Sequence, residues 1–152
     1  MASNTTESRT YPTRPYLAVS AAIFRGDHRV LVVRRAQPPA RDLYTLPGGA
    51  VELGETLEQA VMREAREETG LKVEPVALAG HHEVLARDDA GRIERHFVIL
   101  AFAARWIEGE VSLNEELAEA LWLKPAELSG LATTDGLADI VAAARGRIAT
   151  IS

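Results

Sequence analysis

The sequence contains no cysteine, which excludes a disulfide, a thiol nucleophile and a thiolate metal site. It also lacks an excess of basic residues, because 17 Lys and Arg stand against 22 Asp and Glu and give a net charge of -5. A field of this sign does not attract nucleic acid or an anionic membrane. A polyanionic small molecule would therefore have to be held by bound cations and a few local arginines.

Long apolar runs are missing as well, and none approaches the roughly 20 residues of a membrane-spanning helix. Residues 1–14 are polar and have no hydrophobic centre, so they do not resemble a signal peptide and we expect a disordered tail. Residues 15–148 are long enough for one domain with its own core, since 47% of the 152 residues are hydrophobic. We expect a single cytoplasmic domain.

Short apolar segments separated by turn residues predict a sheet. Strands are expected at Tyr16–Phe24 and 30–34, around the turn Gly26-Asp27, and at 73–86 and 92–106, around a second turn at 88–91. The stretch 97–104 is apolar without alternation, which is typical of a central strand buried on both faces. A C-terminal helix is expected after the capping candidates Thr133 and Thr134, since apolar residues then repeat at helical spacing: Leu137, Ile140, Val141 and Ala144.

A further helix is predicted in the middle of the chain. Thr56 followed by Gln59 has the spacing of a capping box, and Gly70 tolerates the left-handed conformation that ends helices. At about 100° per residue, one stripe of this helix is apolar in its first half and acidic in its second. Its members are Leu57, Ala60, Val61, Glu64, Glu67, Glu68 and Leu71.

The acidic half of this stripe needs a positive partner. Carboxylates at such spacings repel one another, and burial increases the cost. Arg63 and Arg66 point away from the stripe on the helical wheel, so they can orient or screen the acidic cluster but are poorly placed to fill it. A divalent cation such as Mg²⁺ or Mn²⁺, held by carboxylate oxygens, resolves the conflict. A solvated acidic helix is the alternative.

The spacing of the polar residues at 49–71 resembles the signature GX5EX7REUXEEXGU of Nudix hydrolases, which include MutT and the ADP-ribose pyrophosphatases. The matching residues are Gly49, Glu55, Arg63, Glu64, Glu67, Glu68 and Gly70, while Ala65 is smaller than the aliphatic residue usual at its position. The strand 31–35, the segment 44–49 and the segment 119–128 are similar to the flanks of that signature. The resemblance implies an α/β fold, an α/β/α sandwich whose mixed central sheet is flanked by the signature helix and a C-terminal helix.

The resemblance also implies a reaction. We expect Mg²⁺- or Mn²⁺-dependent hydrolysis of the diphosphate linkage in a nucleoside diphosphate joined to another moiety. ADP-ribose or another nucleoside diphosphate sugar is the first choice of substrate, and nucleoside triphosphates, including oxidised ones, are the second. The alternative is a non-catalytic nucleotide sensor. Isopentenyl diphosphate isomerase, which has a similar fold, depends on a catalytic cysteine and is excluded. A homodimer is compatible with the resemblance.

Roles follow by matching positions to the signature. The expected metal ligands are Gly48, Gly49, Glu64, Glu67 and Glu68, with Glu64 and Glu68 direct. The expected catalytic residues are Glu64, Glu68, Arg63, which would orient Glu67, and Glu116, which would act as general base ahead of Glu119. Glu55 is expected to accept from loop amides, with metal ligation as the alternative.

Candidate substrate contacts are Arg35, Arg34 and Tyr44. The two arginines are adjacent on a strand, so at most one of them should face a substrate phosphate, and Arg35 is preferred. The alternative is that both are solubilising charges. The adjacent His81 and His82 are expected to be ordinary strand residues.

Overall fold

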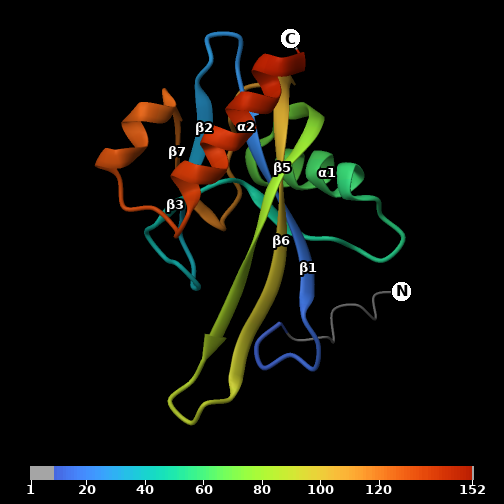
Figure 1. Ribbon diagram of the computed structural model, residues 1–152, viewed down its shortest axis with the longest axis vertical. Coiled ribbons are helices and arrows are strands. Elements are labelled where there is room, and N and C mark those ends of the chain that lie inside the picture. Colours follow the sequence, from blue (N-terminus) through green and yellow to red (C-terminus); the bar gives the residue numbers. More distant parts are fainter. Residues whose placement is uncertain (1–8, 152) are drawn as a thin grey trace.

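The computed structural model describes residues 9–151, so the first eight residues of the expected N-terminal tail lie outside the described part. In chain order the elements are β1 (Tyr16–Phe24), β2 (Val30–Arg35), β3 (Tyr44–Thr45), β4 (Gly48–Ala50), α1 (Leu57–Thr69), β5 (Lys72–Arg87), β6 (Ile93–Glu108), β7 (Leu117–Leu123), the 3₁₀ helix η2 (Pro125–Gly130) and α2 (Leu137–Ile151). Figure 1 shows their arrangement. No helix within the described residues is both long and apolar enough to cross a membrane.

All seven strands belong to one mixed sheet. Its main order is β3-β2-β1-β6-β5, while β4 pairs with β1 and β7 pairs with β2. β1 and β6 are parallel, from Tyr16 opposite Phe97 to Phe24 opposite Arg105. The β1–β2 contact is antiparallel and short. Strand β6 lies inside the sheet, as predicted, but its buried part is the segment 101–104, and residues 97–100 are only half-buried.

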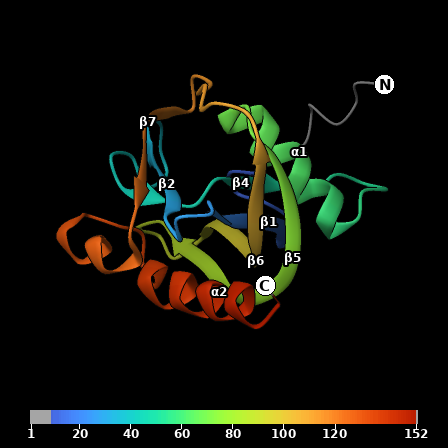
Figure 2. The same cartoon turned by 90° about the horizontal axis from the view of Figure 1, so that it is seen from above.

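Two hydrophobic cores lie on opposite faces of this sheet because side chains alternate along each strand. Odd-numbered residues of β1 and β2, such as Val19 and Leu31, pack with α1. Even-numbered residues, such as Phe24 and Val32, pack with α2. Figure 2 shows the two helices on opposite sides of the strands. The expected α/β/α sandwich is confirmed.

The signature helix forms as its sequence predicts. Thr56 and Gln59 form a capping box, and Gly70 ends α1 with a φ of 76°. The predicted stripe is wrong in one respect: Glu67 is exposed, whereas Ala65 and Thr69 are buried. The small side chain of Ala65 allows α1 to approach the sheet, where it joins the core.

The start of the C-terminal helix differs from the prediction. α2 begins at Leu137, directly after Gly136, which has a φ of 77°. Thr134 does not serve as the cap, because its hydroxyl bonds to that of Thr45 at 3.0 Å. Thr133 forms a bridge to Tyr44. Both threonines therefore join the start of α2 to strand β3.

The long β5–β6 hairpin extends past the rest of the sheet (Figure 1). Its strands pair from Lys72 opposite Glu108 to Arg87 opposite Ile93. Residues 9–14, the described part of the expected tail, run beside it. Tyr11 donates its backbone N–H to the Glu94 carbonyl and its hydroxyl to Asp88, both at 2.8 Å.

Candidate functional site

The site is built where strand β4 meets helix α1. The backbone N–H of Gly48 donates to Oε1 of Glu68 at 3.1 Å. A Cβ on Gly49 would lie 2.4 Å from Oε2 of Glu64, and a Cβ on Gly48 would lie 2.2 Å from the Val19 carbonyl oxygen. Neither position has room for a side chain. The glycine pair therefore lets the backbone of β4 lie directly against two carboxylates.

Both of these carboxylates are withdrawn from water. Glu68 is 4% exposed and the side chain of Glu64 is 14% exposed. Burial raises the pKa of Glu68 to about 7, and the negative charges of Glu64 and Glu116 contribute to the increase, while the Gly48 N–H and the Arg35 charge oppose it. Burial also raises the pKa of Glu64, against the opposing effect of Arg63. Excess negative charge is thus concentrated between β4 and α1.

Arg63 is the main counter-charge within the protein. Its guanidinium donates to Glu55 at 2.6 and 2.9 Å, to Glu64 at 2.8 Å, to Glu67 at 3.1 Å and to the Ala50 carbonyl at 2.9 Å. The helical wheel starts Arg63 away from the carboxylates, but its long side chain curls around the helix to them, which agrees with the expectation that it can orient or screen the cluster. The bond to Glu67 has the predicted i, i+4 spacing. Arg66 is exposed.

Glu55 holds the loop before α1 in place. Its carboxylate accepts the Glu52 N–H at 3.0 Å in addition to the two bonds from Arg63. The bonds from Arg63 keep the pKa of Glu55 below its usual range. The bond from the Glu52 N–H is the loop contact that was expected for Glu55.

The acidic cluster is not a closed metal cage. Within residues 9–151 no three His, Asp or Glu side chains are grouped closely enough to hold a metal ion. The side chain of Glu67 is 57% exposed and shares Arg63 with Glu64, whereas Glu64 and Glu68 are largely withdrawn from water. Mg²⁺ usually takes only one or two protein carboxylates and completes its coordination with water and substrate phosphate. The oxygens of Glu64 and Glu68 fit that donor set.

The loop before β7 brings a further carboxylate to this place. Ser112 donates its N–H to the Thr69 carbonyl at 2.8 Å, and Asn114 donates to the Glu68 carbonyl at 3.4 Å. The Asn114 side chain then accepts the Glu116 N–H at 3.0 Å. The charge of Glu116 raises the pKa of both Glu64 and Glu68, so it lies within electrostatic reach of them. Asn114 was not singled out from the sequence, because its position depends on how the loop packs against α1.

Glu119 belongs to a different cluster. It accepts hydrogen bonds from the Tyr44 hydroxyl and, at 3.2 Å, from Arg34, which also bonds Asp42 at 3.2 Å. These two donors hold the pKa of the Glu119 carboxyl below its usual range. Arg34 lies opposite Glu119 in the β2–β7 pairing, so the cluster follows from strand register.

Arg35 differs from its neighbour. It donates to the Pro39 carbonyl at 2.7 Å, and its charge lowers the pKa of Glu68. The two adjacent arginines therefore serve different clusters, and the β2–β7 register shifts between them. Arg35 is the one whose charge reaches the buried carboxylates.

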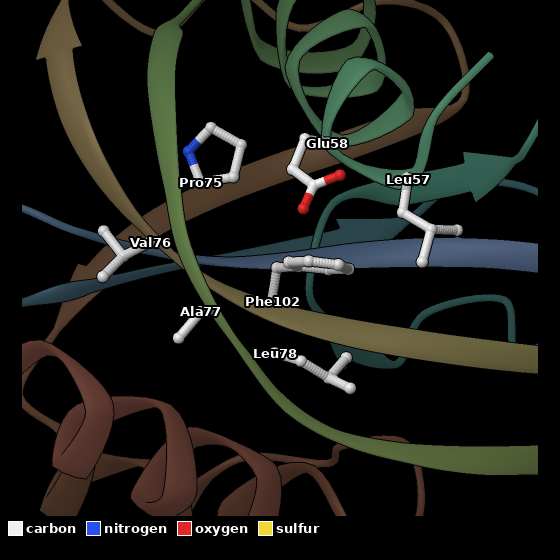
Figure 3. A pocket seen from close by; sticks show the side chains of 7 residues that line it. All are labelled: Leu57, Glu58, Pro75, Val76, Ala77, Leu78 and Phe102. Carbon is white, nitrogen blue, oxygen red and sulfur yellow. The ribbon is translucent and has the colours of Figure 1, made fainter.

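Two further features, a half-buried histidine and an apolar hollow, lie outside the acidic site. Burial lowers the pKa of His82, and its Nδ1 has no partner within the described residues. An apolar hollow lies between the start of α1 and β5, lined by residues that include Leu57, Pro75 and Phe102 (Figure 3). Glu58 is its one charged lining residue, and neither Glu64 nor Glu68 borders it. The hollow is thus separate from the acidic site.

Comparison with known proteins places this geometry in a family. The family model described as NUDIX domain matches residues 14–144. The chain is 37% identical over 106 residues to an ADP-ribose pyrophosphatase of Methanocaldococcus jannaschii, covering 70% of this chain and 60% of that protein. It is 35% identical over 129 residues to the NAD-capped RNA hydrolase NudC of Photobacterium profundum, covering 83% of this chain and 46% of that protein.

The solved structures agree on the fold. A MutT Nudix hydrolase of Burkholderia pseudomallei superposes with a TM-score of 0.73 at 27% identity, over 85% of this chain and 97% of that chain. Since the family model covers most of the chain and includes every residue of the acidic site, this protein belongs to the Nudix family.

Proposed function

We propose that this protein is a Mg²⁺-dependent Nudix pyrophosphohydrolase that cleaves the diphosphate linkage of a nucleoside diphosphate joined to another moiety. Mn²⁺ is the alternative ion. The observation that carries the proposal is the pair Glu64 and Glu68 against strand β4, the first mostly and the second fully buried, with the pKa of Glu68 raised to about 7. Two like charges are costly to bury side by side unless a cation or a substrate binds there.

Glu64 and Glu68 are the direct ligands in this proposal. Glu67, which is exposed and bonded to Arg63, lies at the solvent side of the site. The backbone of Gly48 and Gly49 borders the same two carboxylates, and a carbonyl of this pair is the proposed further ligand. A divalent cation bound there supplies positive charge to the phosphate oxygens and lowers the pKa of a water molecule.

Arg63 has a positioning role. Its bonds to Glu55, Glu64 and Glu67 fix the helix side chains relative to the loop before α1. Glu116 is the proposed general base, because its charge acts on both buried carboxylates. Glu119 is less suited to that role, since two donors occupy its carboxylate and lower its pKa.

Arg35 is the proposed contact for a substrate phosphate. Its charge already acts on Glu68, so an anion bound at the buried pair would lie within its field. Arg34 and Tyr44 are engaged with Glu119, and we propose that they border the site without contacting the phosphate that is cleaved.

Nucleoside diphosphate sugars, with ADP-ribose first, are the proposed substrate class. The similarity to a relative named ADP-ribose pyrophosphatase supports this choice. Nucleoside triphosphates, including oxidised ones, are second. The chain spans less than two thirds of the length of the ADP-ribose pyrophosphatase and of the NAD-capped RNA hydrolase that it matches. Activities that need the unmatched segments of those proteins are not proposed for this chain. The cytoplasmic location expected from the sequence stays a prediction.

The test is a hydrolysis screen with and without Mg²⁺ over ADP-ribose, other nucleoside diphosphate sugars, nucleoside triphosphates and dinucleotides. We expect turnover of at least one substrate and a loss of about a hundredfold or more in Glu68→Gln, because a lost ligand removes several kcal/mol of charge stabilisation. Glu58→Gln, on an exposed position of the same helix, is the matched control. Tight nucleotide binding without turnover by the wild type would favour the sensor instead.

A further inference from the structure

The outer half of β5 is an open sheet edge. Within residues 9–151, β6 is the one strand that pairs with β5. The inner half of β5 is unsuited to further pairing, because it contains Pro75 and three register shifts between residues 72 and 80. From His81 to Ala86 the register with β6 is continuous, and the next shift falls between Ala86 and Arg87, at the outer end of the strand. This regular segment presents backbone N–H and C=O groups to the outside that a second strand could bind.

The opposite edge of the same hairpin is covered. β1 pairs with β6 from Phe97 onward, and the Tyr11 N–H continues along β6 by bonding the Glu94 carbonyl at 2.8 Å. The hairpin thus has a third strand-like segment on one side and, among the described residues, none on the other. Figure 1 shows it projecting beyond the two helices, which leaves the β5 edge accessible.

The side chains along this edge alternate between exposed and half-buried. Glu83, Leu85 and Arg87 are exposed, and Leu85 has 51% of its surface in solvent. Arg87 donates to the Gly91 carbonyl at 3.0 Å, which keeps it beside the turn. Among the described residues Glu83 has no ion-pair partner. An acid, an apolar residue and a base therefore follow one another on one face of the edge.

That order is complementary to itself. If two β5 edges pair antiparallel about a two-fold axis at Leu85, each Glu83 lies opposite the other copy's Arg87, and the two leucines face each other. On the other face Val84 lies opposite Ala86. If the two-fold axis lies at Val84 or Ala86 instead, neither ion pair forms. If it lies at Glu83 or Arg87, two residues of like charge lie opposite each other. The charges thus select one register.

We propose that the segment from His81 to Arg87 is a homodimer interface, in which two copies of this chain join their sheets by antiparallel pairing of β5 centred on Leu85. The partner is a second copy because the complementarity is between the edge and itself. The acidic site lies on α1 and β4 and is not part of this interface.

Sedimentation velocity over a wide concentration range tests the proposal. Wild-type protein is expected to show a monomer–dimer equilibrium. Glu83→Arg places arginine opposite arginine twice and should raise the dimer Kd about tenfold or more. Glu83→Arg combined with Arg87→Glu restores both pairs with exchanged signs, and should return the Kd to within about threefold of wild type. Glu108→Arg, an exposed change of the same charge on β6, is the control and should leave the Kd unchanged.

Each other outcome contradicts the proposal. Wild-type protein that sediments as a monomer at every concentration has no such interface. A dimer that is insensitive to Glu83→Arg, or one that the double variant fails to restore although the single variant weakens it, uses another surface or another register. Amide hydrogen exchange gives an independent check, because residues 81–87 should become protected as the dimer forms.

Discussion

The backbone N–H of Gly48 and the carboxylate of Glu68 are joined by a 3.1 Å hydrogen bond between strand β4 and helix α1. This bond lowers the pKa of Glu68, whereas burial raises it more strongly. A buried acid held in this way keeps a fixed position but is costly to ionise. The hydrogen bond therefore links the position of β4 relative to α1 with the ionisation of Glu68.

The stability of cation-free protein should fall as pH rises, because of Glu68. Its pKa is raised from 4.5 to about 7 on folding, so the folded state binds the proton more tightly than the unfolded state. The resulting stabilisation is complete below about pH 4.5 and is lost as pH rises through about 7, and it amounts to about 3 kcal/mol. Urea unfolding in the presence of a chelator measures it.

Glu68→Gln supplies the control for this pH dependence. Glutamine does not titrate, and its side-chain oxygen can still accept the Gly48 N–H. The difference in unfolding free energy between wild type and variant should therefore change with pH in the stated window. A difference that is constant from about pH 4.5 to about pH 8 would show that Glu68 titrates normally in the folded protein. Added Mg²⁺ should reduce the slope, because a cation stabilises the ionised form.

Gly49→Ala should impair activity more than stability. The new Cβ would lie 2.4 Å from Oε2 of Glu64, and the end of that side chain can move away. Glu64 is a proposed metal ligand, and displacing such a group by about 1 Å can cost on the order of a hundredfold in rate. We expect a loss of that size in kcat/KM with a small change in Tm, measured on the same preparation. Gly26→Ala, which meets no atom within 4 Å, is the control.

Gly48→Ala should show the opposite pattern. Its Cβ would lie 2.2 Å from the Val19 backbone oxygen in the β1–β4 pairing, and backbone cannot move away as a side-chain end can. We expect the unfolding free energy to fall by about 1–3 kcal/mol, the usual range for an overpacked site. Chemical denaturation measures this loss. Equal destabilisation by Gly48→Ala and Gly49→Ala would contradict the assignment of the two glycines to different roles.

Arg63→Lys should destabilise the protein although it keeps the charge. The guanidinium donates to three carboxylates and one carbonyl at once, and an ammonium cannot reproduce that planar geometry. Partly buried oxygens of Glu55 and Glu64 would lose donors, at a cost of about 2–3 kcal/mol. Thermal and urea unfolding measure the effect. Arg66→Lys, on an exposed position of the same helix, should change stability little, and a similar loss there would point to a general helix effect.

Glu116→Gln and Glu119→Gln should separate the two candidate bases. Removing a general base typically lowers kcat by about a hundredfold or more, and we expect this loss for Glu116. Glu119→Gln should retain most activity, because its carboxylate is engaged by Tyr44 and Arg34. The kcat of each variant, measured from about pH 6 to about pH 9, tests the assignment. A large loss in Glu119→Gln alone would transfer the role to that residue.

Local features were read correctly from the sequence because they depend on neighbours a few residues away. The capping box at Thr56, the left-handed end at Gly70 and the turns of the two hairpins all follow from short-range backbone chemistry. The two-residue period of a strand predicted that Arg34 and Arg35 would not face the same group, and they bond to different partners. The signature spacing identified the family, since its residues occupy one helix and the loop before it.

The orientation of side chains around α1 was decided by tertiary structure. A helical wheel places Glu67 with the other glutamates and Arg63 away from them, yet Arg63 curls back to Glu55 and Glu64 and holds Glu67 at the solvent side. The wheel gives the direction in which a side chain starts and does not account for its length. Thr134 shows the same limit, since strand β3 competes for its hydroxyl with the start of α2.

The amino-acid sequence by itself determined the helix that carries the acidic residues, the glycines that precede it and the family, because these are patterns within one short segment. Tertiary structure alone decided that the charge of Glu116 reaches Glu64 and Glu68 and that Glu119 bonds to Tyr44 and Arg34. It also decided that, among the described strands, only β6 lies beside the outer half of β5. Those relationships connect residues that are far apart along the chain. They depend on how the sheet and its loops pack, which no local spacing specifies.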